Sequence, residues 1–130
     1  MASRFPTLLA AAGALSLSFG TALAAEQQPF SKAAFEAAEA AGAPILVEVH
    51  ASWCPTCKAQ TPILGQLTDD QKFKNLAYFV IDFDGQKELV QRFGARMQST
   101  LIVFKGNAEE GRSLGDTNRA SIAALLNKAL

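Results

Sequence analysis

The two cysteines of this chain, Cys54 and Cys57, lie at the junction of two contrasting sequence patterns. Residues 45–51 before them form a β-branched, mostly apolar run, which suits a central strand buried on both faces. From Cys57 to about residue 68 the apolar spacing is helical. A disulfide framework that staples a small fold needs more cysteines, spread more widely. The pair is therefore local chemistry at a strand-to-helix turn, or at most half of a metal site.

The start of a helix is a favourable place for a reactive sulfur. The first backbone N–H groups of a helix lack internal partners and carry partial positive charge, so a thiolate there is stabilised. We expect Cys54 to be the exposed attacking sulfur, with a pKa lowered from about 8.5 to about 7 or below. Cys57, one turn later, is expected to be the covered sulfur that resolves the mixed disulfide. Pro55 fits the first turn of a helix, and Trp53 presents apolar surface to a partner.

Two other interpretations of the cysteine pair involve no turnover. The first is a purely structural disulfide, although closing so short a loop contributes little stability. The second is a zinc site in which His50 joins the two sulfurs. A structural zinc site wants four ligands, and the chain has no second Cys-x-x-Cys. We expect neither a metal nor another cofactor.

The remaining patterns predict a single small domain of the α/β class. The order of the predicted elements is helix, strand, helix, strand, helix, strand, strand, helix, which indicates a central mixed sheet flanked by helices. Capping residues and glycines mark most of the boundaries. Helices are predicted over residues 31–41, 57–68, 86–93 and from Asn118 or Thr117 to residue 130, and strands over residues 45–51, 76–83, 100–104 and 111–114.

Residues 1–24 are typical of a signal peptide. Arg4 gives a positive start, residues 8–19 are apolar, and the Ala-Leu-Ala of residues 22–24 is the small-x-small pattern that precedes cleavage. We expect cleavage after residue 24, a domain over residues 25–130, and a periplasmic or secreted protein. An uncleaved membrane anchor is the weaker alternative, because a span needs about 20 apolar residues and glycine and serine interrupt this run.

Beyond these patterns, the chain resembles the thioredoxin family. The resemblance rests on the Trp-Cys-Pro-Thr-Cys of residues 53–57, on Pro62, on residues 100–106, and on Gly115 before the last helix. It implies the family's fold, a central sheet flanked by helices, and dithiol–disulfide exchange with protein substrates. The Cys-Pro-Thr-Cys sequence looks like that of exported reducing members, such as those that serve cytochrome c maturation. We expect protein substrates to contact Trp53, Pro55, Thr56, Ser99 and Thr100.

Glu48 stands six residues before Cys54, where thioredoxins carry a buried acid. A carboxylate in an apolar central strand is costly unless it has partners or a function. We expect burial to raise its pKa, so that it exchanges a proton with Cys57 near neutral pH and is catalytic. The alternatives are an edge position facing solvent and a salt bridge to Lys58. His50 shares a strand face with Glu48, and we expect it to be packed and hydrogen-bonded.

The resemblance breaks at one position. The family keeps a cis-proline in the loop that faces the cysteines, whereas this chain has Ser99 there and no proline after Pro62. A cis bond before a non-proline residue costs about 2.5–4 kcal/mol, so we expect the Gln98–Ser99 bond to be trans. The family loop pairs with an extended peptide by strand addition. Three consequences are open: altered peptide binding, a hydrogen bond from the Ser99 hydroxyl to the Cys54 sulfur, or space for a metal or a small thiol.

Together these features predict an exported thiol–disulfide oxidoreductase that acts as a reductant rather than an oxidant. A non-catalytic thioredoxin-like chaperone or metal-binding module is the alternative, and the missing proline supports it. Lys and Arg number 12, as do Asp and Glu, so no basic face for nucleic acid is expected. An exported protein has no direct access to cytoplasmic reductants. We therefore expect protein thiols and disulfides as substrates, a membrane-borne electron donor, and a monomer.

Overall fold

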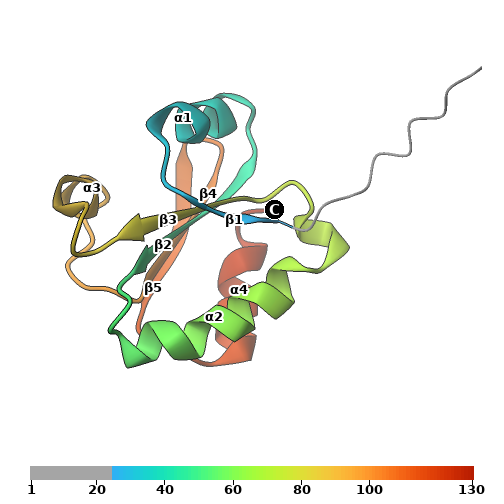
Figure 1. Ribbon diagram of the computed structural model, residues 1–130. Coiled ribbons are helices and arrows are strands. Elements are labelled where there is room, and N and C mark those ends of the chain that lie inside the picture. The colour runs from blue at the N-terminus through green and yellow to red at the C-terminus, as the bar shows by residue number, and fades with distance from the viewer. Residues whose placement is uncertain (1–24) are drawn as a thin grey trace, which may run out of the picture.

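The computed structural model describes residues 25–130, which form a five-stranded sheet with helices on both faces (Figure 1). The predicted signal peptide, residues 1–24, lies outside the described residues. Within residues 25–130 no helix is both long enough and apolar enough to cross a membrane. In chain order the elements are β1 (Gln27–Pro29), α1 (Lys32–Ala40), β2 (Pro44–His50), α2 (Pro55–Thr68), a 3-10 helix (Gln71–Phe73), β3 (Ala77–Asp82), α3 (Lys87–Arg92), β4 (Thr100–Lys105), β5 (Ala108–Leu114) and α4 (Arg119–Asn127).

The sheet is mixed, and its strand order is β1-β3-β2-β4-β5. β1 and β2 both run parallel to β3, whereas β4 runs antiparallel to β2 and β5 runs antiparallel to β4. β2 is therefore the central strand, where Glu48 is paired with Val80 on one side and with Leu101 on the other. The structure confirms the predicted fold class and the predicted burial of this strand.

Successive residues of β2 point to opposite faces of the sheet, and each face has its own helices. Ile45, Val47 and Val49 pack in a core with residues of α1 and α3. Leu46 packs instead with residues of α2 and α4. Figure 1 shows α2 and α4 together below the sheet and α1 and α3 on the opposite side. Glu48 shares the parity of Leu46, so its side chain lies on the face covered by α2, the helix that carries Cys57.

Every predicted element exists, with ends that shift by a few residues. The sequence patterns miss the short 3-10 helix and β1. The three residues of β1 are exposed, and one of them is a proline, so no local pattern marks them as a strand. Their parallel pairing with β3, which is distant in sequence, makes them one. This missed strand matters because it reaches the functional site.

Candidate active site

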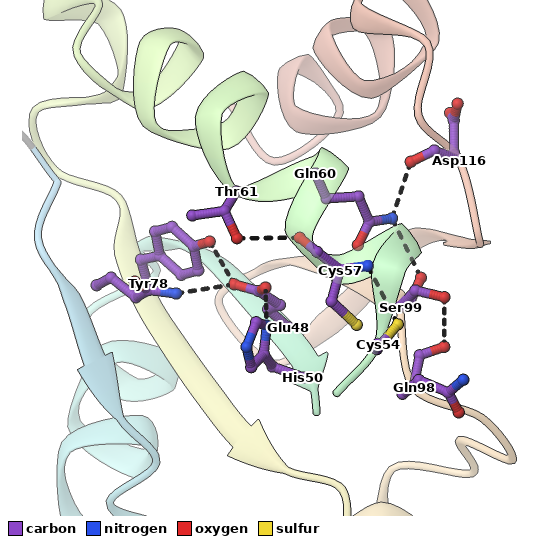
Figure 2. Close-up of polar contacts among 11 residues, drawn as sticks. Glu48, His50, Cys54, Cys57, Gln60, Thr61, Tyr78, Gln98, Ser99 and Asp116 are labelled. Carbon is purple, nitrogen blue, oxygen red and sulfur yellow. Dashed lines mark hydrogen bonds and ion pairs between the residues drawn. The ribbon is translucent and has the colours of Figure 1, made fainter. Parts of the chain in front are cut away.

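Cys54 occupies the N-cap of α2, a few residues after the end of β2. Its backbone is extended, and its Sγ accepts a hydrogen bond from the backbone N–H of Cys57 at 3.1 Å (Figure 2). Pro55 takes the first helical position, where a missing N–H leaves no intrahelical bond unmade. The sulfur thus meets an otherwise unpaired N–H at the positive end of the helix dipole. The predicted placement of the pair at a helix start is confirmed.

The predicted exposure of Cys54 is wrong. Only 2% of this residue is exposed, and Cys57 is fully buried. The Cys54 sulfur turns inward to the Cys57 N–H, and both cysteines pack with Ala51 against Phe83. Cys54 nevertheless lines an open cleft of about 830 Å³ that lies between β1, the end of β2 and the start of α2. His50 lines the same cleft, so the cleft joins the redox pair to the strand side of the site.

Cys57 is held in its protonated form. Both cysteines are free thiols. Burial, and then the hydrogen bond with Cys54, raise the pKa of Cys57 to about 11, while hydrogen bonds from the backbone of Ala51 and Ser99 act in the opposite direction. At neutral pH Cys57 is therefore almost wholly a thiol, and it needs a base before it can attack a disulfide.

Glu48 is fully buried, as predicted, and side chains from β1, β2 and β3 hydrogen-bond to its carboxylate. The Tyr78 hydroxyl donates to Oε2 at 2.5 Å, and Gln27 Nε2 donates to the same oxygen at 3.0 Å. His50 Nδ1 lies 3.1 Å from Oε1, and it carries the hydrogen because a carboxylate oxygen can only accept. Figure 2 shows this polar cluster beside Cys57. Glu48 therefore has neither an exposed edge position nor a salt bridge to Lys58.

The hydrogen bonds leave one acceptor position of Glu48 open. A carboxylate offers about four lone-pair sites. Oε2 uses two of them, for Tyr78 and Gln27, and Oε1 uses one, for His50. Burial, and then the charge and hydrogen bond of Glu48, raise the pKa of Tyr78, so the phenol keeps its proton. Within residues 25–130 no hydrogen bond joins Glu48 directly to Cys57, so a proton transfer between them would need a bridging water molecule or a side-chain movement.

The loop of residues 97–100 lies on the other side of the cysteines. Residues 25–130 contain no cis peptide bond, so the Gln98–Ser99 bond is trans, as predicted. Ser99 has a φ of 60°, and it is the one non-glycine residue within that range whose φ is positive. Its N–H donates to the Val49 carbonyl at 2.7 Å, and its carbonyl accepts from the Gly115 N–H at 3.0 Å. The backbone of Ser99 is thus fully engaged by the protein itself.

The side chains of this loop also turn inward. The Ser99 hydroxyl donates to the Gln98 carbonyl at 2.5 Å and makes no hydrogen bond to the Cys54 sulfur, so the second of the three predicted consequences is wrong. The Thr100 hydroxyl donates to the Met97 carbonyl at 2.7 Å. Within residues 25–130 no cluster of three or more His, Cys, Asp or Glu side chains could hold a metal ion. The hydroxyl groups of Ser99 and Thr100 are thus both bonded to carbonyls of the loop itself.

Comparison with known proteins decides the family. The family model described as Thioredoxin matches residues 26–128. The chain belongs to the thioredoxin family. This thioredoxin-family chain is 32% identical over 82 residues to a thioredoxin of Aspergillus fumigatus, a match that covers 63% of this chain and 74% of the relative. It is 30% identical over 87 residues to a thioredoxin of Pseudomonas aeruginosa, covering 67% of this chain and 80% of the relative.

Solved thioredoxin structures agree. Trxlp from Edwardsiella tarda EIB202 is 40% identical with a TM-score of 0.75, over 78% of this chain and 98% of that one. Thioredoxin NaTrxh from Nicotiana alata, at 21% identity and a TM-score of 0.70, covers 85% of this chain and 97% of its own and supports the fold. The thioredoxin fold predicted from the sequence is confirmed. The chain is a thiol–disulfide oxidoreductase of this family, whose members act on protein disulfides.

The residues predicted to contact substrate differ in their access to it. Trp53 is 58% exposed, and its indole Nε1 donates to Asp84 Oδ2 at 2.7 Å, which fixes the ring beside the cysteines. Pro55 is exposed and Thr56 is half-buried. Across the site, Met97 is 49% exposed. Trp53 therefore places apolar surface next to Cys54, and Met97 places apolar surface on the loop of residues 97–100.

Sequence reasoning misses three residues of the site: Gln27, Gln60 and Tyr78. Tyr78 is the one tyrosine of the chain and stands in a mostly apolar strand, which signals a hydroxyl that needs a buried partner. Gln60 lies three residues after Cys57 on α2 and is fully buried, so a polar residue on the core side of that helix is a similar signal. Gln27 has no local signal, because it belongs to the missed strand β1.

Proposed function

We propose that this chain is an exported reductant of protein disulfides, with Cys54 as the attacking sulfur and Cys57 as the resolving sulfur. The observation that carries the proposal is the place of Cys54: it caps α2, its Sγ meets an N–H at the start of that helix, and it lines an open cleft. Cys57 lies deeper and holds its proton firmly. This asymmetry suits two successive exchange steps.

The two steps balance in electrons and protons. In the first step the Cys54 thiolate attacks one sulfur of the substrate disulfide, the substrate S–S bond breaks, and the other substrate sulfur takes up a proton and leaves. In the second step Cys57 loses its proton and attacks the Cys54 sulfur, and the second substrate thiol leaves. The substrate gains two electrons and two protons, and the chain keeps a Cys54–Cys57 disulfide.

Glu48 is the proposed acceptor of the Cys57 proton. It is the buried carboxylate on the sheet face that α2 covers, and its Oε1 keeps an open acceptor site. His50 is bonded to that same oxygen and lines the cleft, so it offers the proton a path to solvent. A well-placed base contributes about 10²–10⁴-fold to the rate of such a step.

Substrate contact is proposed on both sides of the pair. Trp53, Pro55 and Thr56 meet the polypeptide that carries the disulfide, with Trp53 as the apolar anchor. Ser99 and Thr100 act by shaping the loop, because their own polar groups are engaged within the protein. An extended substrate then pairs with the backbone of residues 97 and 98, in the manner of strand addition.

Export and the reducing direction rest on sequence features. The signal-peptide pattern of residues 1–24 supports a periplasmic or secreted protein, and the likeness of Cys-Pro-Thr-Cys to exported reducing members supports the direction. Outside the cytoplasm the Cys54–Cys57 disulfide needs a donor, for which we propose a membrane-borne dithiol protein. The proposed state is a monomer, since one chain carries both sulfurs.

Insulin reduction by the wild type, Cys54→Ser and Cys57→Ser tests this function. We expect the wild type to be active, Cys54→Ser to be inactive, and Cys57→Ser to accumulate a mixed disulfide with its substrate.

The reduction potential of the Cys54–Cys57 pair tests the direction of the reaction. A value of about −270 mV supports a reductant, and a value of about −120 mV indicates an oxidant. An inactive wild type would instead support a binding module. The mass of the protein recovered after expression of the full chain tests cleavage after residue 24.

A further inference from the structure

Gln60 bridges the active-site helix to two loops. Its side chain is fully buried, and its Nε2 donates to the Asp116 carbonyl at 2.8 Å and to the Ser99 carbonyl at 3.3 Å (Figure 2). Because both partners are backbone carbonyls, the amide nitrogen has to face them, which fixes the orientation of the amide. We call this pair of hydrogen bonds the Gln60 bridge.

The far end of the Gln60 bridge is itself anchored. Asp116 lies just before α4, and its carboxylate accepts from the Asn118 N–H at 2.8 Å and from the Ser121 hydroxyl at 2.5 Å. Next to it, the Gly115 N–H donates to the same Ser99 carbonyl that Gln60 holds. The Ser99 carbonyl is therefore held from two directions, by Gly115, which follows β5, and by Gln60 of α2.

We propose that Gln60 is a positioning residue, which holds residues 97–99 in register with the two cysteines so that an incoming polypeptide meets a preformed backbone. The proposal rests on the proposed function, in which this loop receives the substrate. Gln60 and Cys57 are three residues apart and so share a face of α2. The Ser99 N–H donates to the Val49 carbonyl near the end of β2, the strand that leads to Cys54, so the loop that Gln60 holds is joined to the backbone beside the redox pair.

The chemistry of this position calls for an amide of this length. Only a terminal NH₂ supplies two donors to two carbonyls without carrying a charge into the core. Ser99 needs such support, because its left-handed φ of 60° is disfavoured for a residue with a side chain. A hydrogen-bonded bridge keeps the loop in that conformation when no substrate is present.

The test compares Gln60→Met with a matched control, Gln66→Met, on the same helix. Methionine preserves length and packing but donates nothing, and Gln66 is exposed and binds only the Arg119 side chain. With insulin as substrate we expect Gln60→Met to raise KM about tenfold and to leave kcat within about twofold. With the small disulfide 5,5′-dithiobis(2-nitrobenzoic acid), which needs no strand pairing, we expect rates within about twofold of wild type. Gln66→Met should match the wild type in both assays.

A second variant and a second measurement keep the proposal open to refutation. Gln60→Asn keeps the amide, but its side chain is too short to reach both carbonyls. It should therefore show the same rise in KM, and it replaces Gln60→Met as the test variant if the methionine variant does not fold. Amide hydrogen exchange at Ser99 and Gly115 should be about tenfold faster in the Gln60 variants and unchanged in Gln66→Met. Equal loss with both substrates, or unaltered KM and exchange, would overturn the proposal. A wild type inactive on insulin would refute the proposed function instead, while the exchange rates would still test the bridge.

Discussion

The two sides of the cysteine pair are held by different means. On the strand side, which contains Glu48, side chains form the hydrogen bonds: those of Tyr78, Gln27 and His50 bond the Glu48 carboxylate. On the loop side, residues 97–100, most of the hydrogen bonds come from the backbone, since Ser99 is fixed through its own N–H and carbonyl. One side surrounds a buried group that can carry a proton, and the other shapes a surface.

The difference separates two tasks of the proposed function, proton transfer from Cys57 and reception of the substrate. If Glu48 is the base, changes on the strand side should alter how fast Cys57 loses its proton. If the substrate pairs with the loop backbone as proposed, changes on the loop side should alter how well a polypeptide binds. The following substitutions test whether the two sides are as independent as their contacts indicate.

The largest effect is expected from placing proline on the loop side. Ser99→Pro should lower the free energy of unfolding by about 3 kcal/mol, because proline has no N–H for the Val49 carbonyl and fixes φ near about −65°, far from 60°. Urea denaturation measures the change. Ser99→Gly is the matched control, since glycine keeps the N–H and accepts a positive φ, and it should stay within about 1 kcal/mol of the wild type. Equal stability of the two variants would show that the backbone does not fix this loop.

The next largest effect concerns Glu48, the proposed base. Glu48→Gln should slow the release of substrate from the Cys54 mixed disulfide about a hundredfold, because the amide cannot accept the Cys57 proton. Stopped-flow measurement of single-turnover release isolates this step. Glu110→Gln, an exposed carboxylate on β5, is the control and should leave the rate unchanged. A normal rate in Glu48→Gln would remove Glu48 from the mechanism.

The pH dependence of the resolving step tests the same proposed role of Glu48. Without Glu48, the resolving rate should follow the thiolate form of Cys57 and rise about tenfold per pH unit until pH approaches about 11, the pKa to which burial raises this thiol. The wild type should show a shallower rise.

The same raised pKa of Cys57 favours the neutral thiol in the folded state. The reduced protein should therefore lose stability as pH rises from 9.0 toward about 11, and lose none on this account below that range.

Much of the fold follows from local pattern, and the exceptions have a common cause. The central strand is predictable because its apolar run is buried on both faces, and α2 and α4 because their apolar residues repeat with the helical period. β1 is not predicted by the sequence patterns, because only its pairing with β3 makes it a strand. Local sequence carries no information about a partner that is distant along the chain.

The site divides in the same way. The position of Cys54 at the N-cap is predictable because strand, cysteines and helix are contiguous, and the burial of Glu48 because a charge interrupts an apolar run. The hydrogen-bond partners of Glu48 are not predictable from local sequence, because Tyr78 is 30 residues away along the chain and Gln27 is 21 residues away. The inward turn of the Cys54 sulfur and the positive φ of Ser99 arise from tertiary packing, which no local pattern encodes.

On the strand side, Tyr78→Phe should cost about 2 kcal/mol of unfolding free energy, the usual range for a hydrogen bond to a charged group. The ring stays buried, so packing is preserved, and the loss reports the hydroxyl that holds Glu48 Oε2. A double-mutant cycle with Glu48→Gln provides the control: the cost of Tyr78→Phe should shrink when the carboxylate is absent. Additive costs would mean that the two side chains do not interact. Peptide binding, a property of the loop side, should be unchanged.

The smallest effect tests whether the missed strand β1 belongs to the active site. Gln27→Met should cost about 1 kcal/mol or less, because the Gln27 hydrogen bond to Glu48 is only partly buried. Gln28→Met is the control, since Gln28 lines the same cleft but makes no hydrogen bond to Glu48. If Gln27→Met also slows release from the Cys54 mixed disulfide while Gln28→Met does not, β1 acts on the base through one amide. If both variants behave alike, β1 only borders the cleft, and Glu48 is held by β2 and β3 alone.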